Sequence, residues 1–342
     1  MSESVKILAI ESSCDETAAA VVENGRRVLS DIISTQVPVH RLYGGVVPEI
    51  ASRRHLEMIR PVCEEALREA GLTLADIEAI AVTHGPGLVG ALLVGVSYAK
   101  ALAFAVNKPL IAVHHWQAHM AAAQIEHDPP YPYLSLIVSG SHSGIALMDE
   151  QGCHIIGESH DDAAGEAFDK IARALGLPYP GGPEIEKAGK SGRADYVEFP
   201  RAELENPYDF SFSGLKSAVL NYLNQRQMKG DPLRDEEVPH IAASAEEAIC
   251  DVLSAKTVAA AKAYGIRHIV LCGGVAANSR LRAMLQKRAA RIGAEVLWPS
   301  LRYCTDNAVM VGAAAYRQYV DKDFAPLSLN AMPRLPLPHK AK

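Results

Sequence analysis

Three histidines stand within six residues, at His114, His115 and His119. The apolar residues 109–113 before them predict a buried strand, and the alanine-rich stretch after them predicts a helix that runs to about residue 126. On such a helix His115 and His119 lie one turn apart on one face. Two imidazoles at this spacing can hold one divalent metal, with a carboxylate from elsewhere in the chain as the third ligand. The alternative interpretation is a histidine-rich helix end whose rings are solvated.

Two further segments carry residues suited to chemistry. Residues 11–17, with the sequence ESSCDET, lie between predicted strands at 5–10 and 18–22. An ordinary hairpin needs no such cluster of acids and hydroxyls, so this turn is either a ligand-facing loop or a solvated one. Residues 83–90, THGPGLVG, are predicted to join a strand to a helix N-terminus, which suits an anion or the close approach of another backbone. The spacing matches neither Walker A nor G-x-G-x-x-G, and the glycines could equally permit close helix–strand packing.

The order of the predicted elements divides the chain into two similar halves. After the proline-rich residues 128–132 the opening theme recurs, with a strand at 133–138, a turn of small residues and two more strands to about residue 157. This repetition indicates a duplicated α/β domain, with a ligand expected in the cleft between the halves. We expect domains at 1–130 and 131–325, with the option that the last helix, about 306–320, packs back on the first domain, and a tail at 326–342.

The remaining pattern makes several local predictions. The helix predicted at 49–70 starts with Arg53, Arg54 and His55, which we interpret as a solvated face. The charged residues 225–239 are expected to loop out, and the basic helix predicted at 279–291 is interpreted as a solvated face in preference to an RNA contact. Thr305 is the expected N-cap of the last helix, with Asp306 in its first turn. From about residue 324 the proline-rich tail shows little pattern.

Composition restricts the class of protein. The 342 residues are 49% hydrophobic and 22% charged, as in a soluble globular protein of two ordinary domains. No apolar run reaches the roughly 18 residues of a membrane span, and no signal peptide is recognised, so we expect a cytoplasmic protein with no membrane partner. The net charge of -6 means that a nucleic acid would have to meet a local basic patch or a companion subunit. Six scattered cysteines without a C-x-x-C pair predict reduced thiols.

Nine stretches taken together resemble one family, the bacterial TsaD proteins, which are tRNA N6-adenosine threonylcarbamoyltransferases. The resemblance covers roughly residues 5–320, and motifs this long in one order make chance similarity very improbable. The stretches are 11–17 (ESSCDET), 43–49 (YGGVVPE), 85–90 (GPGLVG), 114–119 (HHWQAH), 165–170 (GEAFDK), 180–183 (PGGP), 210–216 (FSFSGLK), 273–278 (GGVAAN) and 304–307 (CTDN).

The resemblance implies an actin-like ASKHA fold of two duplicated α/β domains around a central cleft. It implies that threonylcarbamoyl-AMP is the donor, that adenosine 37 of tRNAs reading ANN codons is the acceptor, and that one divalent metal, iron or zinc, is bound. Carried over by motif, the metal ligands are His115, His119 and Asp306, and Asp15 and Glu16 match acids regarded as needed for activity. The implied substrate-binding residues are Ile137, Val138, Ser139, Gly140, Ser141, Asp169, Gly182, Glu186 and Asn278.

Two departures from the family pattern stand out. Ser141 replaces a glycine in the V-S-G-G-H-T stretch, which puts a side chain where the backbone normally meets the ligand. Gln117 and Ala118 replace Glu and Gly in H-H-x-E-G-H, although both implied histidine ligands are kept. The family also implies partners: tRNA, a paralogous actin-like subunit (TsaB-like), a P-loop ATPase (TsaE-like) that would use the ATP of the complex, and a separate synthase that makes the donor.

Three rival functions stay open on the residues alone. A metallopeptidase fits the H-x-x-x-H spacing, but Trp116 stands where H-E-x-x-H peptidases place their Glu base. An actin-like sugar kinase would use an Asp-x-Gly phosphate loop after the first strand, and Glu11, Ser12 and Ser13 lack its glycine. A non-catalytic nucleotide-binding scaffold is the third, and the metal ligands and the acidic turn weigh against it.

Overall fold

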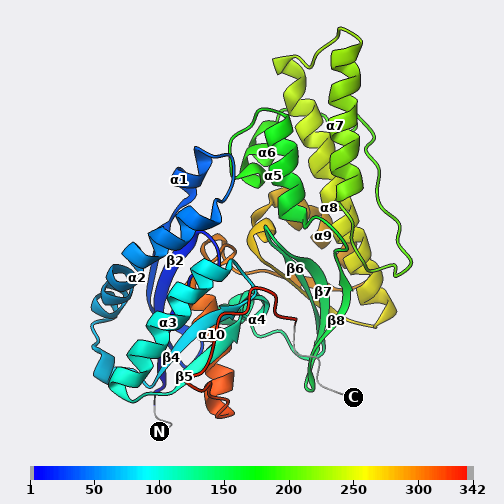
Figure 1. The fold of residues 1–342 in the computed structure, drawn as a ribbon. Coiled ribbons are helices and arrows are strands. Elements are labelled where there is room, and N and C mark those ends of the chain that lie inside the picture. The colour runs from blue at the N-terminus through cyan, green and yellow to red at the C-terminus, as the bar shows by residue number, and fades with distance from the viewer. Residues whose placement is uncertain (1–3, 337–342) are drawn as a thin grey trace. The chain divides into compact units, whose positions relative to one another are not determined.

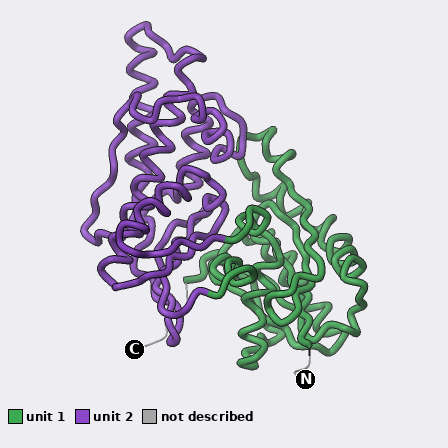
Figure 2. Tube along the Cα trace, turned by 180° about the vertical axis from the view of Figure 1, so that it is seen from behind, with its two compact units in different colours: residues 1–128, 299–338 green, residues 129–298, 339–342 purple. Residues whose placement is uncertain are grey.

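The computed structural model describes residues 4–336. Within these residues the chain divides into two compact units, residues 4–128 with 299–336 and residues 129–298 (Figure 2). The segment from 299 to 325, which the expected boundaries put in the second domain, belongs to the first unit, in keeping with the stated option that the last helix packs back on the first domain. The physical reason is that the last helix, α10 (Ala308–Val320), covers one face of the first unit's sheet.

The first unit is built on a five-stranded sheet in the order β3-β2-β1-β4-β5 (Figure 1). The predicted opening hairpin is present, but a third antiparallel strand that the sequence analysis did not predict extends it into a meander. The last two strands run parallel to β1. The bounds are β1 (Lys6–Glu11), β2 (Glu16–Glu23), β3 (Arg27–Thr35), β4 (Ala79–Gly85) and β5 (Leu110–His114). The helices are α1 (Val37–Arg41), α2 (Pro48–Ala70), α3 (Val89–Val106), α4 (His115–Ala122) and α10, with 3-10 turns at Leu74–Asp76, Ala123–Ile125 and Leu301–Tyr303.

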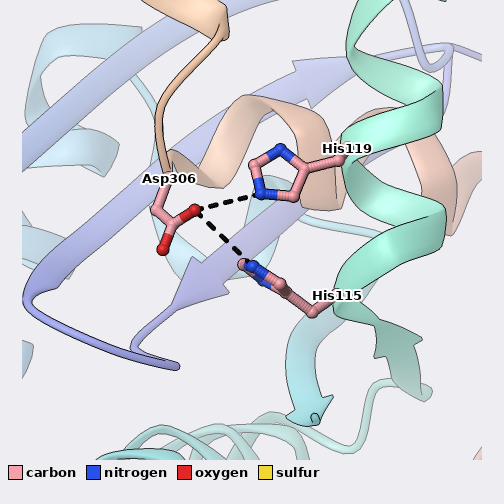
Figure 3. Close-up of side chains that lie close together, drawn as sticks. All are labelled: His115, His119 and Asp306. Atoms are coloured by element: carbon pink, nitrogen blue, oxygen red, sulfur yellow. Dashed lines mark ion pairs between the residues drawn. The ribbon is translucent and has the colours of Figure 1, made fainter. Parts of the chain in front are cut away.

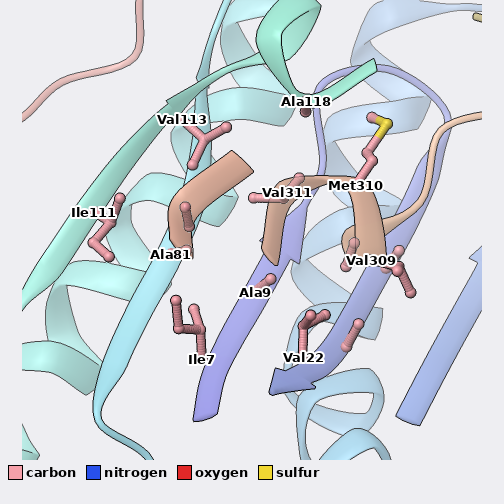
Figure 4. Packing of buried hydrophobic residues seen from close by; sticks show 14 of the residues in the cluster. Ile7, Ala9, Val22, Ala81, Ile111, Val113, Ala118, Val309, Met310 and Val311 are labelled. Carbon is pink, nitrogen blue, oxygen red and sulfur yellow. The ribbon is translucent and has the colours of Figure 1, made fainter. Parts of the chain in front are cut away.

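The central strands are buried on both faces, so they read as continuous apolar runs. Alternate residues separate the two faces: Ile7 and Ala9 lie in the core under α10, whereas Leu8 and Ile10 lie in the core under α2 and α3. Alanines dominate the α10 side, which allows the helix to approach closely (Figure 4). At Gly312 the approach is so close that an added Cβ would lie 2.6 Å from Cγ2 of Val22.

Helix α3 is the one helix of residues 4–336 that is long and apolar enough to cross a membrane, with a mean hydropathy of 1.8 over 18 residues. This finding differs from the expectation that no apolar segment is long enough to span a membrane. Within the unit, α3 packs on β4 and α2 and contributes Leu92, Val96, Ala99 and Ala103 to the buried side of the sheet. Val89, Leu93 and Phe104 of the same helix are exposed, so this packing accounts for only part of its apolar composition.

The second unit repeats the first sheet strand for strand. Its order is β10-β9-β6-β7-β8, with an antiparallel meander β6-β7-β8 and two strands parallel to β6. Two sheets with identical topology are the result expected from the predicted duplication. The strands are β6 (Tyr133–Val138), β7 (Ser143–Asp149), β8 (Gly152–Glu158), β9 (His268–Cys272) and β10 (Glu295–Leu297). The helices are α5 (Ala164–Ala174), α6 (Gly181–Gly189), α7 (Ser213–Met228), α8 (Val238–Ala263) and α9 (Ser279–Ala290), with 3-10 turns at Asp235–Glu237 and Gly274–Ala277.

Two local predictions for this unit are tested by its ion pairs. The expected loop at 225–239 is present at residues 229–237, but its ends are wrong, because α7 continues to Met228 and α8 begins at Val238. The Arg226 guanidinium forms a pair with the buried Glu237 carboxylate, 2.7 Å between Nη1 and Oε1, that joins α7 to the start of α8. On the basic helix α9, Arg280 pairs with Glu246 and Glu247, and Arg288 pairs with Asp251. These cations are therefore neutralised within the unit.

Candidate metal centre

Helix α4 presents two buried imidazoles on one face. Its N-cap is His114, whose Nδ1 accepts a hydrogen bond of 3.1 Å from the Trp116 amide. One residue on, His115 points into the unit, and His119 lies one turn later with its ring centroid 4.6 Å from that of His115. Both side chains are buried, so the alternative of a helix end with solvated rings is wrong.

Asp306 brings the carboxylate that the pair needs (Figure 3). Its Oδ1 lies 3.1 Å from Nε2 of His119 and 3.6 Å from Nε2 of His115. One ligand atom from each of the three residues falls within 4.8 Å of the others. All three belong to the first unit, because α10 returns to its sheet. The expected boundary after residue 130 had separated Asp306 from the histidines, whereas the three expected residues come together within one unit.

The position of Asp306 depends on where α10 begins. The predicted N-cap, Thr305, is wrong: the cap is Asn307, whose side chain accepts a hydrogen bond of 2.9 Å from the Met310 amide. Asn307 also donates 2.8 Å to the Thr305 carbonyl, which fixes the turn before the helix. Asp306 thus precedes the helix, and its carboxylate faces the two histidines.

A buried carboxylate lies behind His115. Glu11, at the end of β1, is fully buried, and its Oε2 lies 3.3 Å from Nδ1 of His115. The same oxygen accepts 2.6 Å from the Thr83 hydroxyl, and Oε1 accepts 2.6 Å from the Ser13 amide. Burial by itself would lower the pKa of His115, but the carboxylates of Asp306 and Glu11 outweigh it and raise the pKa to about 9. The site is therefore electrostatically suited to a cation.

The environment of His119 fits a metal ligand. The ring is 1% exposed, and neither ring nitrogen has a hydrogen-bond partner within residues 4–336. Nε2 lies 3.1 Å from Asp306, but not in the alignment of a hydrogen bond. Leaving two buried nitrogens unbonded is costly, and a cation bound by Nε2 would remove part of that cost. Two imidazoles and one carboxylate are a donor set that suits zinc or iron.

The acidic turn lies in the same unit. Asp15 is buried, and Glu16 accepts a hydrogen bond of 3.0 Å from the Thr35 hydroxyl. Burial, with the charges of Asp15 and Asp306, holds the pKa of Glu16 well above its ordinary value. His55, from helix α2, is fully buried and contacts this turn at two points: the Cys14 carbonyl at 2.9 Å and the Thr17 hydroxyl at 2.8 Å. The interpretation of His55 as part of a solvated face is wrong because its ring supports this turn, whereas Arg53 and Arg54 are exposed and pair with glutamates.

The residues expected to bind the donor all lie in the second unit. Ile137 and Val138 are fully buried in β6, so only their backbone could meet a ligand. The turn after β6 is closed by hydrogen bonds from the Ser139 amide to the His142 carbonyl, 2.8 Å, and from the Gly165 amide to the Ser139 carbonyl, 3.2 Å. Glycines allow close approach here, because a Cβ at Gly273 would lie 2.3 Å from the Val138 carbonyl oxygen. The ends of β6 and β9 thereby meet the start of α5.

The other expected donor residues already have partners within the unit. Asp169 accepts 2.6 Å from the Gly181 amide at the start of α6, and Asn278 caps α9 while donating 2.7 Å to the buried Glu246. Glu186 accepts 2.5 Å from the Ser279 hydroxyl. Gly182 faces open space, with no atom within 4 Å of an added Cβ. A ligand here would meet backbone and an already ordered set of side chains.

The chain is similar to known proteins along most of its length. Residues 27–313 match the TsaD family, described as tRNA N6-adenosine threonylcarbamoyltransferase. A protein of that name from Moorella thermoacetica is 56% identical over 334 residues, which are 97% of each chain. Another, from Clostridium botulinum, is 54% identical over 340 residues, which are 98% of this chain and 99% of the relative. The chain belongs to the TsaD family.

Solved structures show how the TsaD-family chain folds. Full-length HypF superposes with a TM-score of 0.61 at 16% identity, over 92% of this chain and 46% of HypF. The (R)-2-hydroxyglutaryl-CoA dehydratase component A of Acidaminococcus fermentans superposes with a TM-score of 0.55 at 14% identity, over 92% of this chain and 99% of that one. At such identities the likeness concerns the fold alone. The predicted actin-like ASKHA class, with its duplicated α/β units, is confirmed.

Four residues around the TsaD-family histidine pair escaped the sequence analysis as parts of the site: Glu11, Thr83, His55 and, as a helix cap, His114. Each is a polar residue at the end of an apolar strand or inside an amphipathic helix. Polar residues in such places are seldom buried without a partner. That signal singles out Glu11, at the end of β1, and Thr83, near the end of the adjacent parallel strand β4, but it does not name their partners.

Proposed function

We propose that this protein transfers the threonylcarbamoyl group of threonylcarbamoyl-AMP to N6 of adenosine 37 in tRNAs that read ANN codons, giving t6A and AMP. The observation that carries the proposal is the convergence of His115, His119 and Asp306 in a chain that is 56% identical to a transferase of this name. The family supports the reaction, and the cluster supports a metal in it.

The three converging side chains would hold one divalent ion, iron or zinc, through Nε2 of each histidine and Oδ1 of Asp306. A bound ion of this kind supplies a Lewis acid that can orient the donor and polarise its carbonyl. Three protein ligands leave coordination positions open for a substrate. Glu11 would keep the His115 ring oriented by holding the proton on Nδ1.

The second unit would bind the adenylate part of the donor. The amides of Gly140 and Ser141, in the turn after β6, suit a phosphate. Asp169, Gly182, Glu186 and Asn278 would line the adenosine part, as in the family motif. The Ser141 side chain is exposed, and its hydroxyl lies 2.8 Å from Nδ1 of His142, so it turns toward its neighbour and leaves the amide accessible.

The exocyclic amine of adenine must lose a proton during the transfer. Of the two acids in the turn, Asp15 is the better candidate base. The raised pKa of Glu16 keeps that carboxyl protonated at neutral pH, so Glu16 would donate a hydrogen bond instead of accepting a proton.

Partners complete the proposal. A TsaB-like paralogous subunit and a TsaE-like P-loop ATPase would accompany the chain in the cytoplasm, with ATP consumed by the ATPase. The pairing of Arg280 and Arg288 within the second unit favours a tRNA site that is built together with a partner.

The test is mass analysis of tRNA nucleosides after depletion of the protein and complementation with variants. His115→Ala and Asp306→Ala should lose t6A and also lose bound metal. A matched control is His160→Ala, because His160 also faces a carboxylate, 2.6 Å from Asp209, but lies in the other unit with a half-exposed side chain. If t6A persists without metal, the cluster has a structural role only. Release of peptides from an unfolded polypeptide by the pure protein would instead favour the metallopeptidase alternative.

A further inference from the structure

The end of the described chain is bound along the first unit. We name residues 324–336 the C-terminal strap; it is the red segment that approaches α4 in Figure 1. It starts at the edge of the sheet, where the Ala325 amide donates 2.8 Å to the Leu110 carbonyl, and continues past Lys100, whose Nζ donates 2.9 Å to the Leu329 carbonyl. The sequence showed little pattern in this segment, and the strap forms no helix or strand, but its backbone hydrogen bonds fix it to the first unit.

Further along, the strap meets the glycine-rich turn after β4. The Met332 amide donates 2.7 Å to the His84 carbonyl, and the Gly87 amide donates 3.2 Å to the Pro333 carbonyl. A Cβ at Gly85 would lie 2.1 Å from the Met332 carbonyl oxygen, so only glycine admits the strap here. With the Leu88 amide bonded to the Ser13 carbonyl at 2.8 Å, two amides that could have bound an anion are occupied. The turn is a site of backbone approach, which was one of the two sequence interpretations.

The last contact of the strap reaches the metal helix. Nε2 of His114 lies 3.0 Å from the Leu335 carbonyl oxygen, which can only accept, so Nε2 carries the proton. Nδ1 of the same ring is then free to accept from the Trp116 amide and cap α4. The strap thus selects the one neutral tautomer of His114 that caps the helix bearing His115 and His119.

We infer that the C-terminal strap is a positioning element of the metal centre, which acts through His114 and Gly85 to hold the first turn of α4. Leu335 and Met332 are positioning residues in this scheme, since neither touches the candidate ligands. The inference rests on the proposed metal site for its effect on binding, but its effect on the order of α4 is independent of any metal.

The test compares two shortened chains. One ends at Asn330 and lacks the contacts of Met332, Pro333 and Leu335, and the matched control ends at Pro336 and keeps them. Hydrogen exchange of the metal-free proteins should show the Trp116 amide exchanging at least tenfold faster in the first chain only. Zn²⁺ affinity, measured by competition with a chromophoric chelator, should fall about tenfold or more in the same chain. Equal exchange and equal Zn²⁺ affinity in the two chains would overturn the inference.

Two full-length variants separate positioning from general destabilisation. Gly85→Ala should displace the strap and reproduce both effects, whereas Gly214→Ala, where an added Cβ meets open space, should not. His114→Asn keeps an N-cap but cannot reach Leu335, so shortening the chain to Asn330 should weaken Zn²⁺ binding no further in that background. A further tenfold loss there would refute the route through His114. If the full chain binds no Zn²⁺ while the exchange effect remains, the metal proposal fails and the strap inference stands.

Discussion

Oε2 of Glu11 lies 3.3 Å from Nδ1 of His115, in a place where both residues are buried. The other oxygen of Glu11 accepts from the Ser13 amide, which can only donate. The carboxylate is therefore fixed in place, and it makes Nδ1 the protonated nitrogen of His115. Nε2, on the far side of the ring, faces Asp306, and because the pKa of His115 is about 9 this nitrogen also carries a proton at neutral pH until a metal displaces it.

Replacing Glu11 by Gln should reverse that tautomer. The Ser13 amide requires the amide oxygen of Gln at its own side, which leaves the NH2 group facing Nδ1 of His115. That group donates, so in the neutral ring the proton of His115 moves to Nε2 and the lone pair is lost to a metal. We expect Zn²⁺ affinity to fall about 10–100-fold, and nitrogen chemical shifts of the metal-free protein, recorded above pH 9 so that the His115 ring is neutral, should report the exchanged tautomer. Thr83→Ser, which keeps the hydroxyl, is the control, and an unchanged tautomer in the Gln variant would contradict the scheme.

Removing His55 should damage the acidic turn. His55→Leu leaves the Cys14 carbonyl and the Thr17 hydroxyl without their ring partner in a buried place, which we expect to cost about 2–3 kcal/mol of unfolding free energy. Urea unfolding measures this loss. Arg54→Leu, on the exposed face of the same helix, should change stability by less than about 0.5 kcal/mol. Equal effects of the two variants would mean that the ring does not support the turn.

Asp161 should make the stability of the second unit depend on pH. It accepts from the Phe212 amide at 2.8 Å and from the Ser213 hydroxyl at 2.6 Å. Burial opposes the shift, but hydrogen bonds from Ser211, Ser213 and the backbone lower the pKa of Asp161 from 3.8 to about 2. A lowered pKa stabilises the fold above the unfolded value, so this stability is complete above about pH 4 and is lost as the pH falls toward 2.

The matching variant is Asp161→Asn. At neutral pH it should cost about 1 kcal/mol, since the carboxylate caps the start of α7 from a partly exposed place where solvent screens its charge. In urea unfolding, the difference in unfolding free energy between this variant and the unchanged protein should disappear as the pH falls from about 4 toward 2. Asp195→Asn, with an 89% exposed side chain, should show no gap at any pH. A gap for Asp161→Asn that persists at the lowest pH would point to packing instead of charge.

A larger residue at Gly312 should loosen α10. In Gly312→Val the new Cβ would lie 2.6 Å from Cγ2 and 2.9 Å from Cβ of Val22, so the helix must move from the sheet at an expected cost of about 1–3 kcal/mol. Thermal unfolding measures the loss. Arg317→Val introduces the same β-branched side chain on the exposed face of α10 and should cost less than about 1 kcal/mol. Similar losses in both variants would show that helix propensity, and not contact with Val22, is responsible.

The repeated pattern of strands and the placement of His115 and His119 on one helix face could be predicted from the sequence, because both follow from local periodicity. It offered the return of α10 to the first domain only as an option, since that return depends on small residues such as Ala9 and Gly312 meeting across a long interval of chain. The cap at Asn307 was missed for a related reason: Thr305 is an equally good cap by type, and only packing decides between them. The proline-rich strap has no periodicity at all, because its hydrogen bonds are made by backbone groups that every residue possesses.

The departure of the chain from the first unit at residue 128 and its return at 299 have a consequence during synthesis. When residues 1–128 have emerged from a ribosome, one face of their sheet, with Ile7, Ala9 and Val22, still lacks the helix that will cover it. The two histidines are then also without Asp306. The nascent N-terminal half must wait for the second unit to be made before it can close its core, so the three candidate ligands can come together only after residue 306 has been made.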